Sequence, residues 1–475
     1  MPLDWTRPQG ATIQLTLSRR LATDPAQRIG SLLLLAGGPG GSGVDWALDA
    51  QASFSSGLRA RFDIVGFDGR GTGRSNPILC DGELSAARGR LMDPQDAAQF
   101  TALRQTNQAL VESCRTLSGP IVDHMDSASV VRDMEAIRAA LGEERLSYYG
   151  VSYGTLPGQQ YAEQFPRRVR AAVLDANMDH SLDNWGIQKT SSQALEEALG
   201  QFADWCARTP DCALHGRDVR KLYASLYKKA EAGQLSIFTA KDLGGFAFGH
   251  VASSADWYTF AQVLASLNAG QPGAAQGALA PLPDRRIHSA PHKAPSRAAK
   301  ATTPSCRPAG QPCDTPPAAP APLPLLQLHC ADFNLTLPDH AAVAGFQRKL
   351  ARIAPLTRHA WQSWNTMIGC QGWSTKPSNP PHRLNVDGAP PILLTNSRYD
   401  VRTPYSWAVN VARQIGKQAV LLTYDGVAHD LSETSPCMRD AADKYLIDLT
   451  PPRKGTHCPA EWPTNSSARP RANTP

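Results

Sequence analysis

The sequence lacks any long hydrophobic run. A membrane-spanning helix needs about 18 or more consecutive apolar residues, whereas the densest run here, Leu32 to Ala36, is five residues long and is followed by glycines. No two cysteines have the Cys-x-x-Cys spacing that is typical of zinc sites and redox motifs. We therefore expect neither a membrane span nor a metal site.

An excess of charge of one sign is also lacking. The 48 Lys and Arg residues against 42 Asp and Glu residues give a net charge of +6 in 475 residues. Six Lys or Arg residues and two Asp residues lie between Gly273 and Leu325, so this stretch holds four of the six excess charges. A basic arm for nucleic acid or membranes is one interpretation, but the absence of interleaved aromatic residues favours a solvated linker. We expect no nucleic-acid partner.

Aromatic residues are missing from one long stretch. None occurs between Ala261 and Asp332, and the segment from Pro281 to Pro324 holds 12 prolines in 44 residues. Such a segment has no side chains with which to build a packed core. We expect a disordered or extended loop, which either an insertion or a local reading-frame error would produce.

The remaining composition is that of a folded globular protein. Hydrophobic residues make up 42% and charged residues 19% of the chain, which is close to globular averages. At about 150 residues per domain, the length predicts three domains or one large domain with an insertion.

The ten cysteines fall into near-neighbour sets. An even number with this clustering indicates disulfides and an oxidising compartment, so we expect a secreted or periplasmic protein. Reduced cysteines in a cytosolic enzyme are the alternative, and the connectivity is left open. The chain opens Met1-Pro2-Leu3 without a basic and apolar leader, and we expect a misplaced start codon or a removed leader. The sets are Cys80 with Cys114, Cys206 with Cys212, Cys306 with Cys313, Cys330 with Cys370, and Cys437 with Cys458.

Short apolar runs alternate with helical patterns at both ends of the sequence. Ser31 to Ala36 and Phe62 to Phe67 have the length of buried strands, and each precedes a glycine-rich turn. This alternation is typical of an α/β fold with one mostly parallel sheet flanked by helices. The other expected strands are Leu146 to Gly150, Ala171 to Asp175, Pro391 to Thr395 and Ala419 to Thr423; the expected helices are Ser127 to Leu141, Thr155 to Phe165, Thr403 to Gly416 and Cys437 to Asp448.

The middle of the chain has a different pattern. From Trp185 to about Pro380 the strand and helix alternation disappears, and apolar residues recur at helical spacing from Leu195 to Cys206. We interpret residues 185–380 as a helical cap that contains the proline-rich segment (about 273–325). The cap divides a sheet domain into a first part, residues 1–184, and a C-terminal part, residues 381–475.

The strongest chemical signal is the Gly-x-Ser-x-Gly motif from Gly150 to Gly154. It follows an expected strand and precedes an expected helix, which is the context of the sharp turn that exposes a nucleophilic serine above an α/β-hydrolase sheet. A glycine turn with an uninvolved serine is the alternative. We predict that Ser152 is the nucleophile.

A serine hydroxyl needs a base, and the base needs an orienting carboxylate. On this fold the acid and then the histidine follow the serine in the chain. Asp400 follows one late strand and His429 follows the next, so we predict that they complete a catalytic triad. Asp425 and Asp430 are rivals for the acid, but they lie too near His429 in sequence to reach its far ring nitrogen.

The reaction also needs hydrogen-bond donors for an oxyanion. The glycine-rich stretch from Gly37 to Gly43 follows a strand and lets the main chain approach the serine. We assign the two N–H donors to Gly38 and Tyr153. A phosphate-binding loop is disfavoured because no Lys-Ser/Thr pair follows and the spacing is not Gly-x-Gly-x-x-Gly.

Together these motifs resemble the tripeptidyl-aminopeptidase-like branch of the prolyl-aminopeptidase family of α/β-hydrolases, which are secreted bacterial serine exopeptidases. The resemblance implies the α/β-hydrolase fold, the triad of Ser152, Asp400 and His429, and removal of short peptides from free N-termini through an acyl-enzyme. It implies no cofactor, and we expect a monomer. The residues that carry it are Pro2-Leu3-Asp4-Trp5, Gly37 to Gly43, Phe67 to Ser75, Arg132 to Arg138, Gly150 to Thr155 and Asn396 to Asp400.

An aminopeptidase must also bind a protonated amine. Glu196 and Glu197 lie on the first expected cap helix, off its apolar face, and are candidates for this role, with plain solvated carboxylates as the alternative. Two competing functions remain open. One is an esterase or lipase that uses the same triad, and the other is a catalytically impaired protein that binds peptides.

Overall fold

The computed structural model describes residues 1–235, 238–271, 319–323, 325–373 and 377–464. Most of the proline-rich segment lies outside the described residues, as do Cys306 and Cys313. The expectations for these parts therefore stay predictions.

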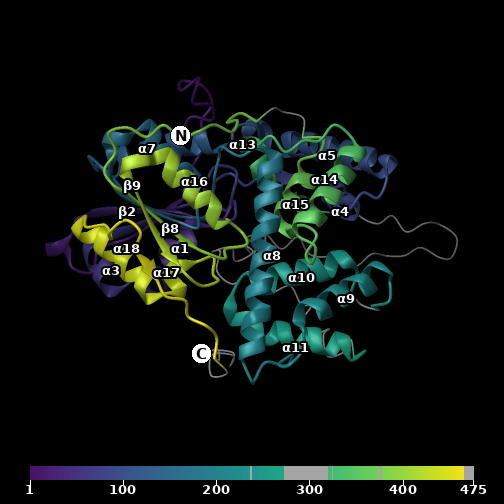
Figure 1. Ribbon diagram of the computed structural model, residues 1–475. Coiled ribbons are helices and arrows are strands. Elements are labelled where there is room, and N and C mark those ends of the chain that lie inside the picture. The colour runs from purple at the N-terminus through teal and green to yellow at the C-terminus, as the bar shows by residue number, and fades with distance from the viewer. Residues whose placement is uncertain (236–237, 272–318, 324, 374–376, 465–475) are drawn as a thin grey trace, which may run out of the picture.

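A central sheet organises the first and last parts of the chain (Figure 1). Among the described residues it has eight strands, in the order β1-β3-β2-β5-β6-β8-β9-β10, and only the β1 and β3 pair is antiparallel. This architecture is the α/β-hydrolase fold, as predicted. The strands are β1 (Leu17–Arg20), β2 (Gly30–Leu35), β3 (Phe62–Phe67), β5 (Leu146–Val151), β6 (Val169–Asp175), β8 (Ile392–Ser397), β9 (Ala419–Tyr424) and β10 (His457–Cys458).

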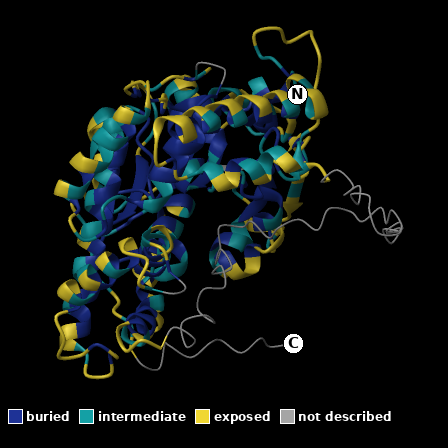
Figure 2. Ribbon diagram, turned by 90° about the vertical axis from the view of Figure 1, so that its right-hand side faces the viewer, coloured by how far each residue is buried: buried dark blue, intermediate teal, exposed yellow. Residues whose placement is uncertain are grey.

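Helices cover both faces of the sheet. Alternate residues of β2 point to opposite faces, so Leu33 packs with α6 (Ser127–Ala140), α7 (Thr155–Gln164) and α16 (Tyr405–Ile415). Leu32 packs with α1 (Gly43–Leu48), α3 (Ser56–Arg61) and α18 (Pro436–Asp448). Strands that are buried on both faces have continuous apolar runs in their sequence, and for this reason the strands of the sheet could be predicted from the sequence. Figure 2 shows the inner strands of the sheet dark blue, with exposed positions on outer helix faces and loops.

A further set of helices forms a second body beside the sheet (Figure 1). The long helix α8 (Asn184–Arg208) joins two groups. One group is α9 (Val219–Glu231), α10 (Ala240–Val251) and α11 (Trp257–Asn268), which share one apolar core with α8. The other is α13 (His329–Asp332), α14 (His340–Ile353) and α15 (Trp361–Gly369), which pack with α4 (Gly82–Leu91) and α5 (Ala97–Ser118). The earlier helices α4 and α5 thus contribute to this body, and the division at residues 185 and 380 stays an interpretation.

Four of the predicted cysteine sets are disulfide-bonded. The bonds join Cys80 with Cys114, Cys206 with Cys212, Cys330 with Cys370, and Cys437 with Cys458. Disulfides persist in oxidising environments, so they are consistent with an extracellular location. Within the described parts of the chain, no helix combines the length and apolarity needed to cross a membrane.

Several motifs that carry the family resemblance meet in one buried network. The Arg70 guanidinium forms a bidentate pair with Asp133, at 2.8 and 2.7 Å. Arg70 also donates to the carbonyl oxygen of Leu3 at 2.8 Å, and Trp5 Nε1 donates to Asp133 at 3.0 Å. A buried ion pair is stable only when its remaining donors and acceptors are satisfied. These bonds therefore hold the N-terminal segment against the loop that follows β3 and against α6.

Candidate active site

Ser152 lies on a sharp turn between β5 and α7. Its φ of 56° is in the left-handed region, which is a strained conformation for a residue with a side chain. A Cβ atom added at Gly154 would lie 2.0 Å from the Leu35 carbonyl oxygen, and one at Gly37 would lie 2.8 Å from the Ser152 Cβ atom. Glycine is thus required at both positions for the chain to pass this closely. The turn has the geometry predicted from the motif.

Asp400 and His429 lie on the loops that follow the neighbouring strands β8 and β9. The Nδ1 atom of His429 is 2.9 Å from Asp400 Oδ2 and 3.1 Å from Oδ1. The Nε2 atom of His429 is buried and has no hydrogen-bond partner among the described residues. With the proton on Nδ1, Nε2 is an acceptor, as a general base for a serine hydroxyl requires. The structure thus brings the predicted acid and base together, and Ser152 follows β5 at the same edge of the sheet.

Further hydrogen bonds hold the Asp400 carboxylate. The main-chain N–H groups of Arg402 and Thr403 donate to Oδ1 at 2.8 and 3.0 Å, and the Thr403 hydroxyl donates to Oδ2 at 2.9 Å. Asp400 is 1% exposed. These donors fix the orientation of the carboxylate, which in turn fixes the imidazole of His429.

The loop that bears His429 is held on both sides of the histidine. Before it, the Ser397 hydroxyl donates to the Gly426 carbonyl oxygen at 2.7 Å and accepts from the Ala428 N–H at 3.2 Å. After it, the Leu431 N–H donates to Asp175 at 3.0 Å. Asp175 is fully buried at the end of β6, and burial raises the pKa of its carboxyl to about 6. Asp175 and Ser397 therefore support the position of His429.

Asp425 and Asp430, the other candidates for the acid of the triad, form hydrogen bonds with other residues. The carboxylate of Asp425 is 2.9 Å from the Nδ1 atom of His457, on β10, and Asp430 accepts from the Ser432 hydroxyl at 3.3 Å. No cluster of three or more His, Cys, Asp or Glu side chains that could hold a metal ion is found in the part of the chain that the structure describes.

The glycine-rich loop after β2 packs against the turn of Ser152. Gly38 has a φ of 119°, a conformation that glycine adopts readily. The loop is closed by a hydrogen bond from the Gly41 N–H to the Gly37 carbonyl oxygen at 2.9 Å. It then enters α1, where the Ser42 hydroxyl donates to the buried Asp68 at 2.6 Å. The assignment of the Gly38 and Tyr153 N–H groups as oxyanion donors stays a prediction.

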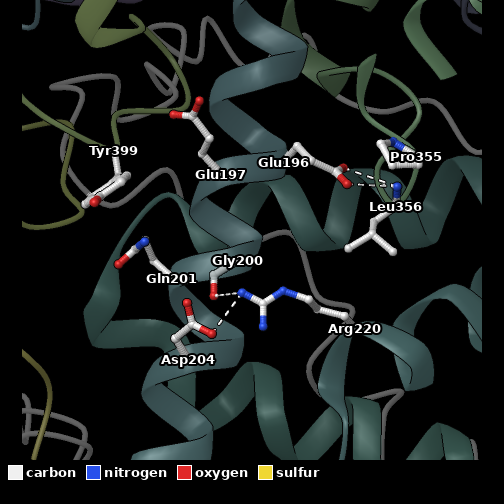
Figure 3. A pocket seen from close by; sticks show the side chains of 9 residues that line it. All are labelled: Glu196, Glu197, Gly200, Gln201, Asp204, Arg220, Pro355, Leu356 and Tyr399. Carbon is white, nitrogen blue, oxygen red and sulfur yellow. Dashed lines mark hydrogen bonds and ion pairs between the residues drawn. The ribbon is translucent and has the colours of Figure 1, made fainter. Parts of the chain in front are cut away.

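A cavity of about 480 Å³ lies beside the loop of Asp400, within the range of about 300–1,000 Å³ typical of ligand pockets. Tyr399, the chain neighbour of Asp400, lines it together with Glu196 and Glu197 of α8. Figure 3 shows the two glutamates leaving the helix in different directions. The Glu196 carboxylate turns to the main chain, where it accepts from the Leu356 N–H at 3.1 Å.

Among the described residues, no main-chain group donates a hydrogen bond to the Glu197 carboxylate, and its side chain leaves α8 on the side away from Leu356 (Figure 3). It is exposed to solvent, yet partial desolvation raises the pKa of its carboxyl, while the nearby Arg398 acts in the opposite direction. Of the two predicted candidates for binding an amine, Glu197 is the one that is exposed to solvent, whereas the Glu196 carboxylate is held by the main chain.

Sequence reasoning missed the residues that support the acid and base. Asp175 could have been found, because it ends a predicted strand and the carboxyl ends of parallel strands meet at one edge of the sheet. No comparable signal marks Thr403, which lies at the start of an expected helix, or Ser397, which comes two residues after the end of the expected strand Pro391 to Thr395.

Comparisons with known proteins agree with this fold. Residues 30–266 match the family model described as "alpha/beta hydrolase fold", and residues 354–458 match the model described as "TAP-like protein". The tripeptidyl aminopeptidase of Streptomyces coelicolor is 29% identical over 94% of this chain and 80% of its own length. The serine protease Hip1 of Mycobacterium tuberculosis is 29% identical over 96% of this chain and 86% of its own length. Carboxylesterase B of the same species is 29% identical over 96% of this chain and 85% of its own length.

The fold and the matches to known proteins together identify this protein as a serine hydrolase of the α/β-hydrolase class. The chain belongs to the TAP-like family within that class, which confirms the resemblance noted in the sequence.

Proposed function

We propose that this protein is a secreted or periplasmic exopeptidase that releases short peptides from free N-termini, in the manner of a tripeptidyl aminopeptidase. The observation that carries the proposal is the bond between His429 Nδ1 and Asp400, at 2.9 Å. The buried Nε2 atom of His429 has no hydrogen-bond partner among the described residues, Ser152 included, and in this proposal it accepts the proton of the Ser152 hydroxyl.

In the proposed acylation step, Ser152 Oγ attacks the carbonyl carbon of the scissile bond while His429 Nε2 takes its proton. The Asp400 carboxylate stabilises the imidazolium that forms. The tetrahedral oxyanion is bound by the N–H groups of Gly38 and Tyr153. His429 then donates the proton to the departing amine, and water activated by the same nitrogen releases the short peptide from the acyl-enzyme.

In this proposal Glu197 binds the free N-terminal ammonium of the substrate. A carboxylate in a cavity beside the catalytic loop sets how far the amine lies from the scissile bond, and therefore favours exopeptidase over endopeptidase cleavage. Glu196 was an equal candidate in the sequence, but its carboxylate is engaged by Leu356 and Thr357. We therefore assign the amine to Glu197 alone.

The relatives support a peptidase and an esterase to the same degree. Tripeptidyl aminopeptidase, serine protease and carboxylesterase are all names of relatives at 29% identity. The four disulfides support the proposed location outside the cytosol.

A comparison of three substrates tests the proposal. We expect rapid hydrolysis of an Ala-Ala-Pro-type tripeptide anilide, much slower hydrolysis of its N-acetylated form, and no preference for a p-nitrophenyl ester. Equal rates on the free and blocked peptides would reject the aminopeptidase. Fast ester cleavage with no peptide cleavage would support the carboxylesterase instead.

A further inference from the structure

Tyr153, the residue that follows the proposed nucleophile, has a side chain that the proposed reaction does not use. Its hydroxyl donates a hydrogen bond to Asp332 Oδ2, and its ring packs edge-on against the His329 ring, with 5.0 Å between ring centroids. Burial and the neighbouring carboxylate raise the pKa of Tyr153 well above its ordinary value. The hydroxyl therefore stays protonated and remains a donor at every working pH.

Asp332 is itself held firmly. It ends α13, is 0% exposed, and lies 179 positions after Tyr153 in the sequence. Its Oδ1 atom accepts from the Ser127 N–H at 3.0 Å and from Asn379 Nδ2 at 2.8 Å. Its carbonyl oxygen is 2.8 Å from the Nε2 atom of His180. A buried carboxylate with several donors in fixed directions is a rigid acceptor.

The helix that carries Asp332 is also covalently fixed. The disulfide between Cys330 and Cys370 joins α13 to the C-terminal end of α15. Ser127 begins α6, one of the helices that cover the sheet. The Asp332 carboxylate therefore links the helical body to the sheet at the turn that bears Ser152.

We propose that Asp332 is a positioning residue for the oxyanion hole, and that it fixes the direction of the Tyr153 N–H by holding the Tyr153 hydroxyl. This inference rests on the proposed serine-hydrolase function. Donors must lie about 2.7–3.1 Å from the position of the oxyanion, and Tyr153 follows a residue in the strained left-handed conformation. An anchored side chain prevents rotation of this short turn, so the N–H stays aimed at the developing charge.

The Tyr153→Phe variant tests this role directly. We expect kcat to fall about 10-fold, with KM within about twofold of the wild-type value. The loss should be smaller than the 10²–10³-fold typical of a deleted oxyanion donor, because the N–H itself remains. The rate of serine labelling by a fluorophosphonate should fall in parallel, since phosphonylation uses the same donors.

Tyr161→Phe is the matched control. The Tyr161 hydroxyl also donates to a carboxylate, that of Glu135 at 2.8 Å, and Tyr161 lies on α7, the helix that follows the same turn. A folding effect of losing a tyrosine hydroxyl would appear in both variants. An effect on oxyanion positioning should appear only in Tyr153→Phe.

A double-mutant cycle with Asp332→Asn completes the test. If the two side chains act as one unit, Tyr153→Phe should change kcat little once Asp332 has been replaced. Wild-type kcat in folded Tyr153→Phe, or independent multiplying losses, would overturn the inference. Should the single variant fail to fold, the Tyr153→Phe/Asp332→Asn double variant, which leaves no buried charge short of a donor, must still show the lowered kcat. Absence of any labelling of the wild type would instead reject the proposed function.

Discussion

The two sides of Ser152 are held by different regions of the molecule. On one side, Asp400 and His429 lie on loops from adjacent strands, and their supports belong to the same sheet edge. On the other side, the Tyr153 side chain is bound by Asp332, which belongs to the helical body. In our proposals the sheet therefore positions the base and the helices position the oxyanion donor. The chemistry then requires that both regions be docked correctly.

Removing Ser152 removes the group that both regions serve, so it should have the largest effect. We expect Ser152→Ala to lower kcat by ~10⁴-fold or more, while peptide binding persists because the cavity beside Tyr399 is unchanged. Steady-state hydrolysis and calorimetric titration with an uncleaved peptide measure the two quantities. A folded variant that keeps a tenth of wild-type kcat would contradict the role of Ser152.

The buried Arg70 and Asp133 pair provides a contrast, because none of its hydrogen bonds goes to Ser152, Tyr153, Asp400 or His429. Arg70→Met leaves the Asp133 carboxylate buried without its partner, which should lower the free energy of unfolding by about 3–5 kcal/mol. Urea denaturation measures this change. Arg70→Met/Asp133→Leu should recover part of the loss, because no charge is left buried. A marked fall in kcat of the folded single variant would show that this network also supports catalysis.

Glu197→Gln tests the part of the helical body that is proposed to bind substrate. A hydrogen bond to a charged group contributes about 1.5–3 kcal/mol, and the solvent exposure of Glu197 favours the low end of this range. We expect KM for a free tripeptide anilide to rise about tenfold, with little change for the N-acetylated form. Glu196→Gln is the matched control, because its carboxylate binds the main chain at Leu356. An equal change in KM for both variants would contradict the assignment.

The pH dependence of KM gives a second view of Glu197. The carboxyl binds an ammonium ion only when ionised, so KM should rise as the pH falls through the pKa of Glu197. Because desolvation raises this pKa, the rise should begin at a higher pH than for an ordinary glutamate, whose pKa is about 4.3. Glu197→Gln should abolish this dependence. An unchanged acid limb in the variant would show that another group causes it.

The contrast between the two regions also explains what the sequence could predict. Leu32 to Leu35 form a strand because of their local pattern, and the ends of parallel strands meet at one sheet edge by topology. Ser152, Asp400 and His429 could therefore be selected from their places after strands. These inferences need only short-range patterns and one general rule of sheet geometry.

No comparable rule predicts which residues of the helical body lie near Ser152. Asp332 lies 179 positions after Tyr153 in the sequence, and nothing local marks it as the partner of a tyrosine. Glu196 and Glu197 are chemically identical neighbours, and their difference depends on where residues 355–357 dock against α8. Such contacts result from tertiary packing between helices, which periodicity does not specify.

The smallest expected effect, that of Thr403→Val, gives the sharpest test of whether the sheet and the helical body act separately on Ser152. Thr403→Val removes one hydroxyl donor to Asp400 and keeps the side-chain shape, so the loss of about 1 kcal/mol should lower kcat about fivefold. Thr423→Val is a control, because the buried Thr423 hydroxyl bonds Tyr405 and not the acid. The decisive measurement is kcat of Thr403→Val combined with Tyr153→Phe. If the sheet and the helical body hold the two sides of Ser152 independently, the two losses should multiply; strong coupling would mean that a single shared network holds both.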